Sequence, residues 1–386
     1  MIGHLPAAVV VTSLLVAGAV PTASDTLKQD VRAIVATGAS GVLAETQTQD
    51  GHERARYGVA DLDSRRPVPW NAYYRIGSDT KTFTATVALQ LVGEGRLRLG
   101  DSVEKWLPGL VKGHGNDGRR ITVKNLLRQT SGLNDYLAEL PLVQNLTSNG
   151  YRKHRFTSFT PLQLVDLGLR KPPGWLPNAK NPAEETRWGY SNTNYLLVGL
   201  IIEKVTGRPW VQEIHERVIQ PLRLRHTFTP GTSAYVPQPT ATPYSWLPGS
   251  TRPTDTSIFA ANSGADGGIV STPQDLATFL RALLGGRLLG PAEMAEMKRT
   301  VEAKGWIVAP GTRYGLGIGW RPAEGCDGGI WFHGGTSLGV VSESGVTGDG
   351  ARSAVAAVFT LRFDDKQEDQ DRAAVRLVDR SLCRPG

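Results

Sequence analysis

The sequence predicts an α+β fold in which an antiparallel sheet is flanked by helices and carries an inserted helical lobe. Strand-like segments occur near both ends of the chain, whereas helical periodicity dominates the middle. An amphipathic helix is expected to close the chain over residues 364–382. One sheet is therefore expected to be assembled from both termini, with the helical part inserted between them.

Local patterns justify the elements in turn. Ser24 or Asp25 can cap a first helix that has Leu27, Val31 and Ile34 on one face. A hairpin is predicted from residues 41–47 and 56–61, on either side of Asp50-Gly51. Helical runs are expected at residues 82–92, 126–127, 162–169, 195–205 and 276–284. Later strands are expected at residues 315–320, 329–332, 339–344 and 353–361.

The predicted organisation has three parts. Residues 1–23 are expected to be a signal peptide, because residues 5–20 are almost wholly apolar, too short to span a bilayer, and followed by small residues. The segment before this stretch has no Lys or Arg, so an uncleaved anchor is the alternative. Residues 24–77 and 255–386 are predicted to form the sheet lobe and residues 78–254 the helical lobe, with the site in the cleft between them.

Composition limits the partners. The 386 residues are 40% hydrophobic and 20% charged, as in a soluble globular protein. The net charge is +7, but Lys and Arg alternate with Asp and Glu, so no nucleic-acid partner is expected. The histidines other than His333 are isolated and lack metal-binding spacing, so we expect no metal. No cofactor is expected either. We expect a monomer that is secreted or extracytoplasmic, with no stable membrane span after signal cleavage.

Two cysteines support that compartment. Cys326 precedes a strand-like run and Cys383 ends the last helix, so a disulfide would pin this helix to the sheet. Two unrelated buried thiols are the alternative.

Ser78-Asp79-Thr80-Lys81 precedes the first long apolar helix. Ser78 would lie at the helix N-terminus, where free N–H groups favour negative charge, and Lys81 would share its face one turn on. An ammonium facing apolar residues favours a lowered pKa or a polar network. The alternative is a capping serine followed by a solvated lysine. Ser102-Val103-Glu104-Lys105 has the same spacing and is interpreted as a chance match.

Tyr190-Ser191-Asn192 opens a second helix. A nearby lysine would lower the pKa of Tyr190 and make it a usable base. Asn192 has a donor and an acceptor, so it can hold Lys81 and a substrate amide together. The alternative is helix capping by Ser191 or Asn192.

His333-Gly334-Gly335-Thr336 ends a short predicted strand. The glycines would let a substrate backbone lie against the strand edge. The N–H groups of Thr336 and Ser78 would form an oxyanion hole. Gly335 to Gly339 also match G-x-S-x-G, but the triad of that motif needs a histidine after the serine, and His333 is the last one. A histidine at a strand-to-turn bend is the alternative.

These three motifs together resemble the class C β-lactamase-related serine hydrolases, most closely the secreted soluble D-alanyl-D-alanine carboxypeptidases. The likeness extends to Ile121–Leu133 and Tyr314-Gly315-Leu316-Gly317. It implies a β-lactamase/transpeptidase-like fold and an acyl-enzyme on Ser78. Lys81 and Tyr190 would share the proton, and His333 would stand where many relatives have lysine, protonating the leaving group or binding a substrate carboxylate.

The chain departs from the carboxypeptidase pattern at Gly334, where a hydroxyl residue is common, and at Gly319, where an arginine can anchor the carboxylate. Arg321 is the substitute candidate, since it shares a strand face with residue 319. The sequence therefore predicts a D-alanyl-D-alanine carboxypeptidase that acts on cell-wall peptides and is acylated by β-lactams. A β-lactamase, an esterase or D-amino-acid peptidase, and a β-lactam sensor without turnover are the alternatives.

Overall fold

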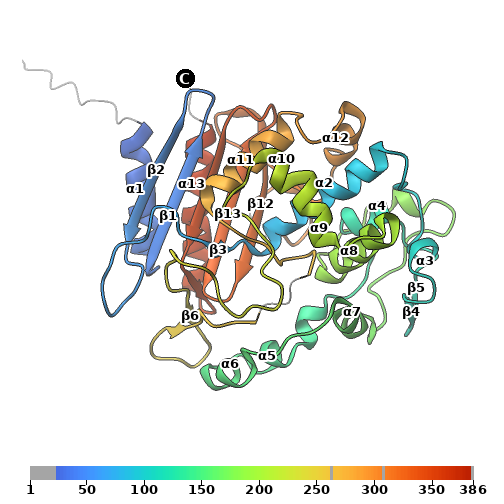
Figure 1. The fold of residues 1–386 in the computed structure, drawn as a ribbon, viewed down its shortest axis with the longest axis horizontal. Helices are drawn as coiled ribbons and strands as arrows, with labels where there is room; N and C mark the ends of the chain where they lie inside the picture. Colours follow the sequence, from blue (N-terminus) through green and yellow to red (C-terminus); the bar gives the residue numbers. More distant parts are fainter. Residues whose placement is uncertain (1–22, 261–263, 307–308, 384–386) are drawn as a thin grey trace, which may run out of the picture.

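A computed structural model describes residues 23–260, 264–306 and 309–383. Its main sheet has eight strands in the order β2-β1-β14-β13-β12-β11-β10-β9 (Figure 1). The N-terminal hairpin of β1 (Gly41–Gln47) and β2 (His52–Gly58) pairs with the C-terminal strand β14 (Ser353–Val358). This confirms that one antiparallel sheet is assembled from both ends of the chain.

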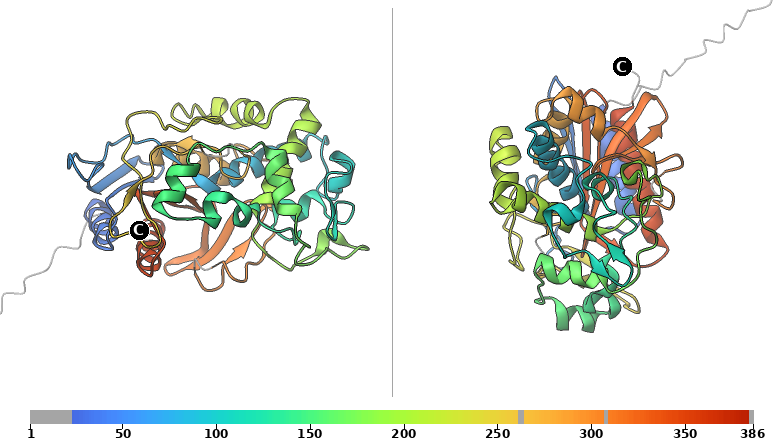
Figure 2. Two further views of the ribbon diagram at one scale, coloured as in Figure 1. Left: turned by 90° about the horizontal axis from the view of Figure 1, so that it is seen from below. Right: turned by 90° about the vertical axis from the view of Figure 1, so that its right-hand side faces the viewer.

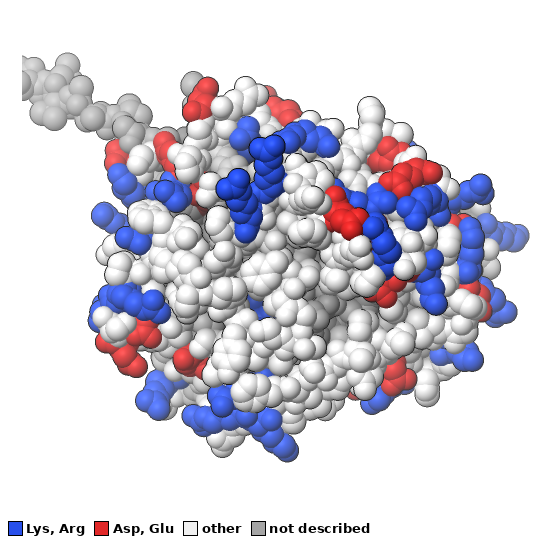
Figure 3. Space-filling view, in the orientation of Figure 1, with Lys and Arg blue, Asp and Glu red and all other residues white. Residues whose placement is uncertain are grey.

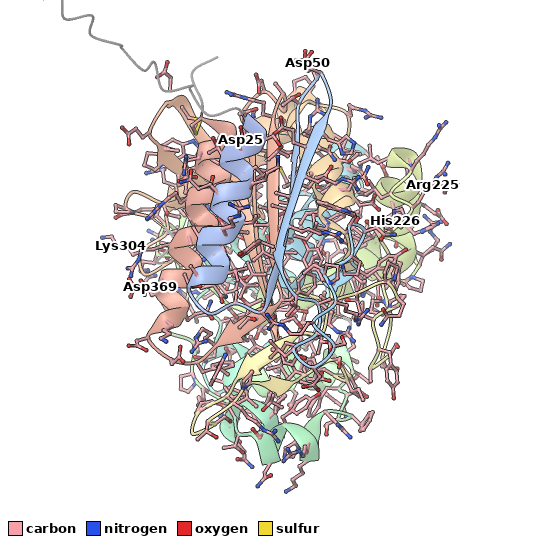
Figure 4. The ribbon with its side chains drawn as sticks, turned by 90° about the vertical axis from the view of Figure 1, so that its left-hand side faces the viewer. Asp25, Asp50, Arg225, His226, Lys304 and Asp369 are labelled. Atoms are coloured by element: carbon pink, nitrogen blue, oxygen red, sulfur yellow. A yellow bond between two sulfur atoms is a disulfide. The ribbon has the colours of Figure 1, made fainter. Side chains whose placement is uncertain are left out.

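Helices cover both faces of this sheet. Helices α1 (Ala23–Ala36) and α13 (Lys366–Leu382) lie side by side on one face (Figure 4). Helix α11 (Pro273–Leu284) packs on the other. Strand β14 is therefore buried along its whole length, which explains its run of alanine and valine. The inward positions of α13 predicted from its pattern are buried: Ala374, Leu377, Val378 and Leu382.

The half of the main sheet that contains β9 to β12 differs from prediction in two places. The strand expected at residues 315–320 is two strands, β10 (Arg313–Tyr314) and β11 (Gly319–Ala323), because the chain turns between them at Gly317, whose φ is +81°. Strand β12 (Cys326–Ser337) is longer than predicted, so the His333 segment lies inside it. Strands β13 (Val340–Thr347) and β9 (Val301–Glu302) complete the sheet.

The hairpin also begins its second strand earlier than predicted, at His52. Its first residues, His52, Glu53 and Arg54, are polar and not buried, so the pattern has no apolar signal there. This strand forms one edge of the sheet, where charged side chains are common.

The helical part is inserted between these strands (Figure 2). Its α-helices are α2 (Thr80–Gly93), α3 (Val103–Trp106), α4 (Val123–Leu127), α5 (Pro141–Gln144), α6 (Ser148–His154), α7 (Pro161–Leu169), α8 (Asn192–Thr206), α9 (Trp210–Ile214) and α10 (Gln220–Leu222); α12 (Pro291–Met297) follows later. Short helical turns are η1 (Gly77–Asp79), η2 (Tyr136–Glu139), η3 (Pro182–Glu184) and η4 (His215–Ile219). Small sheets pair β3 (Tyr74–Arg75) with β8 (Val270–Ser271), β4 (Lys112–Gly113) with β5 (Asn116–Asp117), and β6 (Tyr244–Trp246) with β7 (Thr254–Asp255) and β15 (Thr360–Arg362). The exact limits of the two lobes stay a prediction.

The predicted signal peptide lies outside the described residues, except for its last position. Within the described ranges, no helix combines the length and apolar character needed to cross a membrane. On the face drawn in Figure 3, Lys and Arg form separate groups interspersed with acidic side chains. This is the scattering that the sequence predicts.

The predicted disulfide is confirmed. Cys326, at the start of β12, is bonded to Cys383, directly after α13, and their Cα atoms are 4.9 Å apart. The bond therefore closes the end of α13 onto the sheet that it covers.

Reduction of this bond should destabilise the protein. Closing a loop of 57 residues contributes about 4 kcal/mol in the chain-entropy model. We expect a lower melting temperature in reductant for the wild type, measured by thermal unfolding, and no effect of reductant on Cys383→Ser. Identical melting temperatures of oxidised and reduced wild type would contradict this.

Candidate active site

The turn that carries Ser78 lies directly against strand β12. Gly77 has a φ of +53°, and a Cβ atom there would come within 2.7 Å of the backbone nitrogen of Thr336. A Cβ atom on Gly335 would lie 1.8 Å from the carbonyl oxygen of Ile76. Both positions therefore require glycine. The contact places the backbone of Thr336 beside Ser78, as the predicted oxyanion hole requires.

Lys81 is fully buried one helical turn after Ser78. Its Nζ lies 3.0 Å from Ser78 Oγ, 2.6 Å from Asn192 Oδ1 and 2.6 Å from the carbonyl oxygen of Asp266. Burial lowers the pKa of Lys81 to about 8, although the negative charges of Asp266 and Asp135 oppose the shift. On the order of a tenth of this lysine is therefore neutral at pH 7, and the neutral fraction grows as the pH approaches 8.

The partners of Lys81 determine where a neutral amine would direct its lone pair. Asn192 donates from Nδ2 to Asp135 Oδ2 at 2.8 Å, so its Oδ1 faces Lys81 as an acceptor. The carbonyl oxygen of Asp266 can also only accept. These two oxygens take both protons of a neutral amine, which leaves its lone pair facing Ser78. The geometry therefore supports Lys81 as the base that activates Ser78.

Tyr190 is hydrogen-bonded to the Ser78 side chain, and its ring centroid lies 5.0 Å from Lys81 Nζ. The predicted fall in its pKa is wrong: burial, followed by the neighbouring Tyr314, raises the pKa well above the ordinary value. Tyr190 therefore stays a neutral phenol. In that form it can donate a proton toward a leaving group rather than remove one from Ser78.

His333 lies in the cleft wall, almost fully buried. Burial, helped by the charge of Lys81, lowers its pKa to about 3. Its Nδ1 lies 2.7 Å from the carbonyl oxygen of Gly334 and therefore carries the proton, so Nε2 accepts from the Tyr314 hydroxyl at 3.1 Å. A neutral imidazole offers no charge to a substrate carboxylate.

Arg321 is not part of the cleft, which corrects the prediction that it anchors a carboxylate. It is fully buried, with Nη1 2.9 Å from Glu343 Oε1 and Nη2 2.8 Å from Asp379 Oδ1. Arg321 does share a strand face with Gly319, but α13 covers that face. Between the strand and this helix, the guanidinium packs over the ring of Phe332. Its charge is therefore paired with two carboxyl groups of the protein and is not available to a substrate.

The alternative serines have other surroundings. Ser102 caps helix α3, where its side chain accepts from the backbone N–H of Lys105. Ser337 ends β12 and lines the cleft, but Lys81 directs its amino group to Ser78. The structure thus brings Ser78, Lys81, Tyr190, Asn192, His333, Gly335 and Thr336 together and leaves Arg321 apart.

The cleft has a volume of about 1160 Å³ and includes residues that the motifs did not predict. Asp135 and Asp266 line it beside Lys81, and Trp306 forms an aromatic cluster with Trp188 and Tyr314. Asp135 lies two residues after the Ile121–Leu133 segment that carries part of the family resemblance, and this closeness is the signal that could have pointed to it. Asp266 carried no such signal, because its backbone oxygen makes the contact.

The fold and this arrangement define a serine hydrolase in which a lysine and a tyrosine flank the nucleophile. The chain belongs to the β-lactamase family, whose model, described as Beta-lactamase, matches residues 27–380. This confirms the resemblance inferred from the three motifs.

Solved structures of relatives cover nearly the whole chain. A D-stereospecific amidohydrolase from Streptomyces sp. is 38% identical, with a TM-score of 0.80 over 91% of this chain and 98% of that one. The D-amino acid amidase from Ochrobactrum anthropi SV3, complexed with L-phenylalanine amide, is 25% identical, with a TM-score of 0.75 over 91% and 97% of the two chains.

Protein flp from Staphylococcus aureus (strain MW2) is 34% identical over 171 residues, 44% of this chain. The match spans only 31% of that protein's length.

The pH dependence of acylation tests Lys81 as the base. Because only the neutral amine can accept the Ser78 proton, the acylation rate should rise about tenfold per pH unit below the Lys81 pKa of about 8. Asn192→Asp places a carboxylate beside the ammonium and should move the rise to higher pH. The measurement is the rate of acylation by a neutral ester across this range.

The exposed amide of Asn71 offers a matched control, since Asn71→Asp adds the same charge outside the cleft. Its pH profile should follow the wild type. A rate that does not change between about pH 6 and about pH 8 would exclude Lys81 as the base.

Proposed function

We propose that this protein is a D-stereospecific amidohydrolase that acylates Ser78 with the D-aminoacyl part of an amide or ester substrate. The charge distribution of the cleft is the observation that carries this proposal. It favours a substrate with a free ammonium group over one with a free carboxylate.

The described lining residues supply little positive charge. The lysine and arginine side chains among them are Lys304 and Arg372, and both are exposed and lie next to acids. Lys304 Nζ is 3.8 Å from Glu302, and Arg372 Nη2 is 2.7 Å from Asp369. His333 is neutral, and Arg321 is buried elsewhere. A D-alanyl-D-alanine carboxypeptidase must bind a terminal carboxylate, which charge-assisted contacts would favour.

Acidic groups, in contrast, lie next to the nucleophile. Asp135 and Asp266 line the cleft on the side of Lys81 and Asn192. Burial raises the pKa of both carboxyl groups. The ammonium of a D-aminoacyl group whose carbonyl carbon is at Ser78 would favour their ionised form and be attracted to it. Acetylation of that amine would remove the interaction.

An apolar wall forms another side of the cleft. It consists of Leu137, Leu140, Leu142, Val143, Leu146, Phe259 and Leu338. Leu137 and Val143 are among the exposed large apolar side chains of the described surface. Burying a substrate side chain here would contribute about 25 cal/mol per Å² of apolar area. We therefore propose D-amino acids with large apolar side chains as the acyl group.

The relatives support the same substrate class. A further structure of the Ochrobactrum amidase holds D-phenylalanine, with a TM-score of 0.76 and 25% identity to this chain. Together with the Streptomyces amidohydrolase, this favours D-aminoacyl amides over cell-wall peptides, and it corresponds to the D-amino-acid peptidase alternative from the sequence.

We also propose that the enzyme works outside the cytoplasm as a monomer. The Cys326–Cys383 bond supports the location, because disulfides persist in oxidising compartments.

Substrate competition tests the proposal. We expect D-phenylalanine amide to have a higher kcat/KM than its L-enantiomer, a D-alanyl-D-alanine peptide or a cephalosporin. N-acetyl-D-phenylalanine amide should be at least about tenfold poorer, since it loses one charge-assisted contact. Steady-state kinetics on one purified sample provide the comparison.

Asp135→Asn should reduce the preference for the free amine over the acetylated amide, and Ser78→Ala should abolish turnover of both. If the wild type instead prefers the D-alanyl-D-alanine peptide, the enzyme is a carboxypeptidase and the proposal fails.

A further inference from the structure

A buried carboxyl group lies directly behind the nucleophile. Asp79 follows Ser78, is 1% exposed, and makes no side-chain hydrogen bond to cap helix α2. It reaches the sheet instead, where its Oδ1 lies 2.7 Å from the hydroxyl oxygen of Ser344 on β13. Among the described residues, its Oδ2 has no hydrogen-bond partner.

The hydrogen bonds of Ser344 can be counted. Its hydroxyl oxygen also lies 2.6 Å from the carbonyl oxygen of His333. A serine hydroxyl has one proton, and a carbonyl oxygen only accepts. If Asp79 were ionised, its carboxylate and the carbonyl of His333 would compete for that single proton. A protonated Asp79 can donate to Ser344, which then donates to His333, so each short contact contains a proton.

We propose that Asp79 is a positioning residue: a neutral carboxylic acid whose proton completes a hydrogen-bond chain through Ser344 to the backbone of His333. The chain ties the turn that carries Ser78 to the strand that supplies Thr336. Its effect is to hold the two backbone N–H groups of the oxyanion hole in register before substrate arrives.

The groups around Asp79 favour the neutral form. Burial raises the pKa of Asp79 to about 8, against the opposing effects of the Ser344 and Ser342 hydroxyls and the charge of Lys81 on α2. Glu343 on β13 raises the pKa of Asp79 further. The hydroxyl of Tyr74 on β3 lies 3.2 Å from the hydroxyl of Ser342, so Ser342 also has Tyr74 as a hydrogen-bond partner. The imidazole of His333 on β12 is neutral. At pH 7 the acid form therefore predominates.

Protonation can be measured without any substrate. The infrared difference spectrum between wild type and Asp79→Asn at pH 7 should contain the carbonyl band of a protonated carboxylic acid. Asp79→Asn keeps the shape and a donor, but it does not titrate.

Folding stability provides a second test. The pKa of Asp79 rises from 3.8 to about 8 on folding. At pH values between these two, folding of the wild type takes up a proton, so its stability falls as the pH rises. Relative to Asp79→Asn, its folding equilibrium constant should fall by up to about tenfold per pH unit across this window.

Acylation kinetics connect the proton to the site. Asp79→Asn should acylate at close to the wild-type rate at neutral pH, because its amide can donate to Ser344. Asp79→Ala and Ser344→Ala should each lose about tenfold or more, and their combination should lose less than the product of the two effects. Ser102→Ala serves as the control. If Asp79→Ala does not fold, the acylation rate of Ser344→Ala still tests the proposal.

An ionised Asp79 would give the opposite set of results: no carboxylic acid band lost in Asp79→Asn, a stability difference that does not change with pH, and an Asp79→Asn variant as impaired as Asp79→Ala. These outcomes concern the acylation machinery and not the substrate, so they are distinct from a failure of the proposed amidohydrolase activity.

Discussion

The contact between the Ser78 turn and strand β12 is the constraint on which the site depends. A side chain at Gly77 would collide with the backbone of Thr336, and one at Gly335 would collide with Ile76. With glycine at both positions, the sheet and the first helix of the inserted lobe meet backbone to backbone. Ser78 and the backbone N–H groups that we propose as oxyanion donors are thus held together by the fold itself, before any substrate binds.

Burial then sets the protonation of each group around this contact. It lowers the pKa of Lys81 and of His333, and it raises the pKa of Tyr190 and of Asp79. All four shifts favour the neutral form, since removing a charge from water is costly. At pH 7 the resting site therefore contains a neutral imidazole, a phenol and a carboxylic acid. Lys81, with a pKa of about 8, is still largely an ammonium there and must lose its proton before it can act as the base.

The sequence predicted the parts of the site that depend on local placement. Ser78 lies in the turn η1 directly before α2, and Asn192 begins α8. Because Lys81 is one turn after Ser78, the short motifs predicted that these two side chains lie together. Arg321 was misplaced because strand alternation tells which face a side chain takes but not that α13 covers this face. The pKa of Tyr190 was misjudged because burial by Trp188, Trp306 and Tyr314 arises only in the folded protein. The charge of the cleft was likewise visible only once distant segments had met.

Direct observation of the acyl-enzyme tests the central claim. The wild type would be mixed with the p-nitrophenyl ester of D-phenylalanine, quenched in acid within its first turnovers, and digested for mass spectrometry. The account predicts a D-phenylalanyl group on the peptide that contains Ser78, absent from Ser78→Ala and present in Ser102→Ala. Ester turnover with the adduct on another residue, or retained by Ser78→Ala, would contradict it.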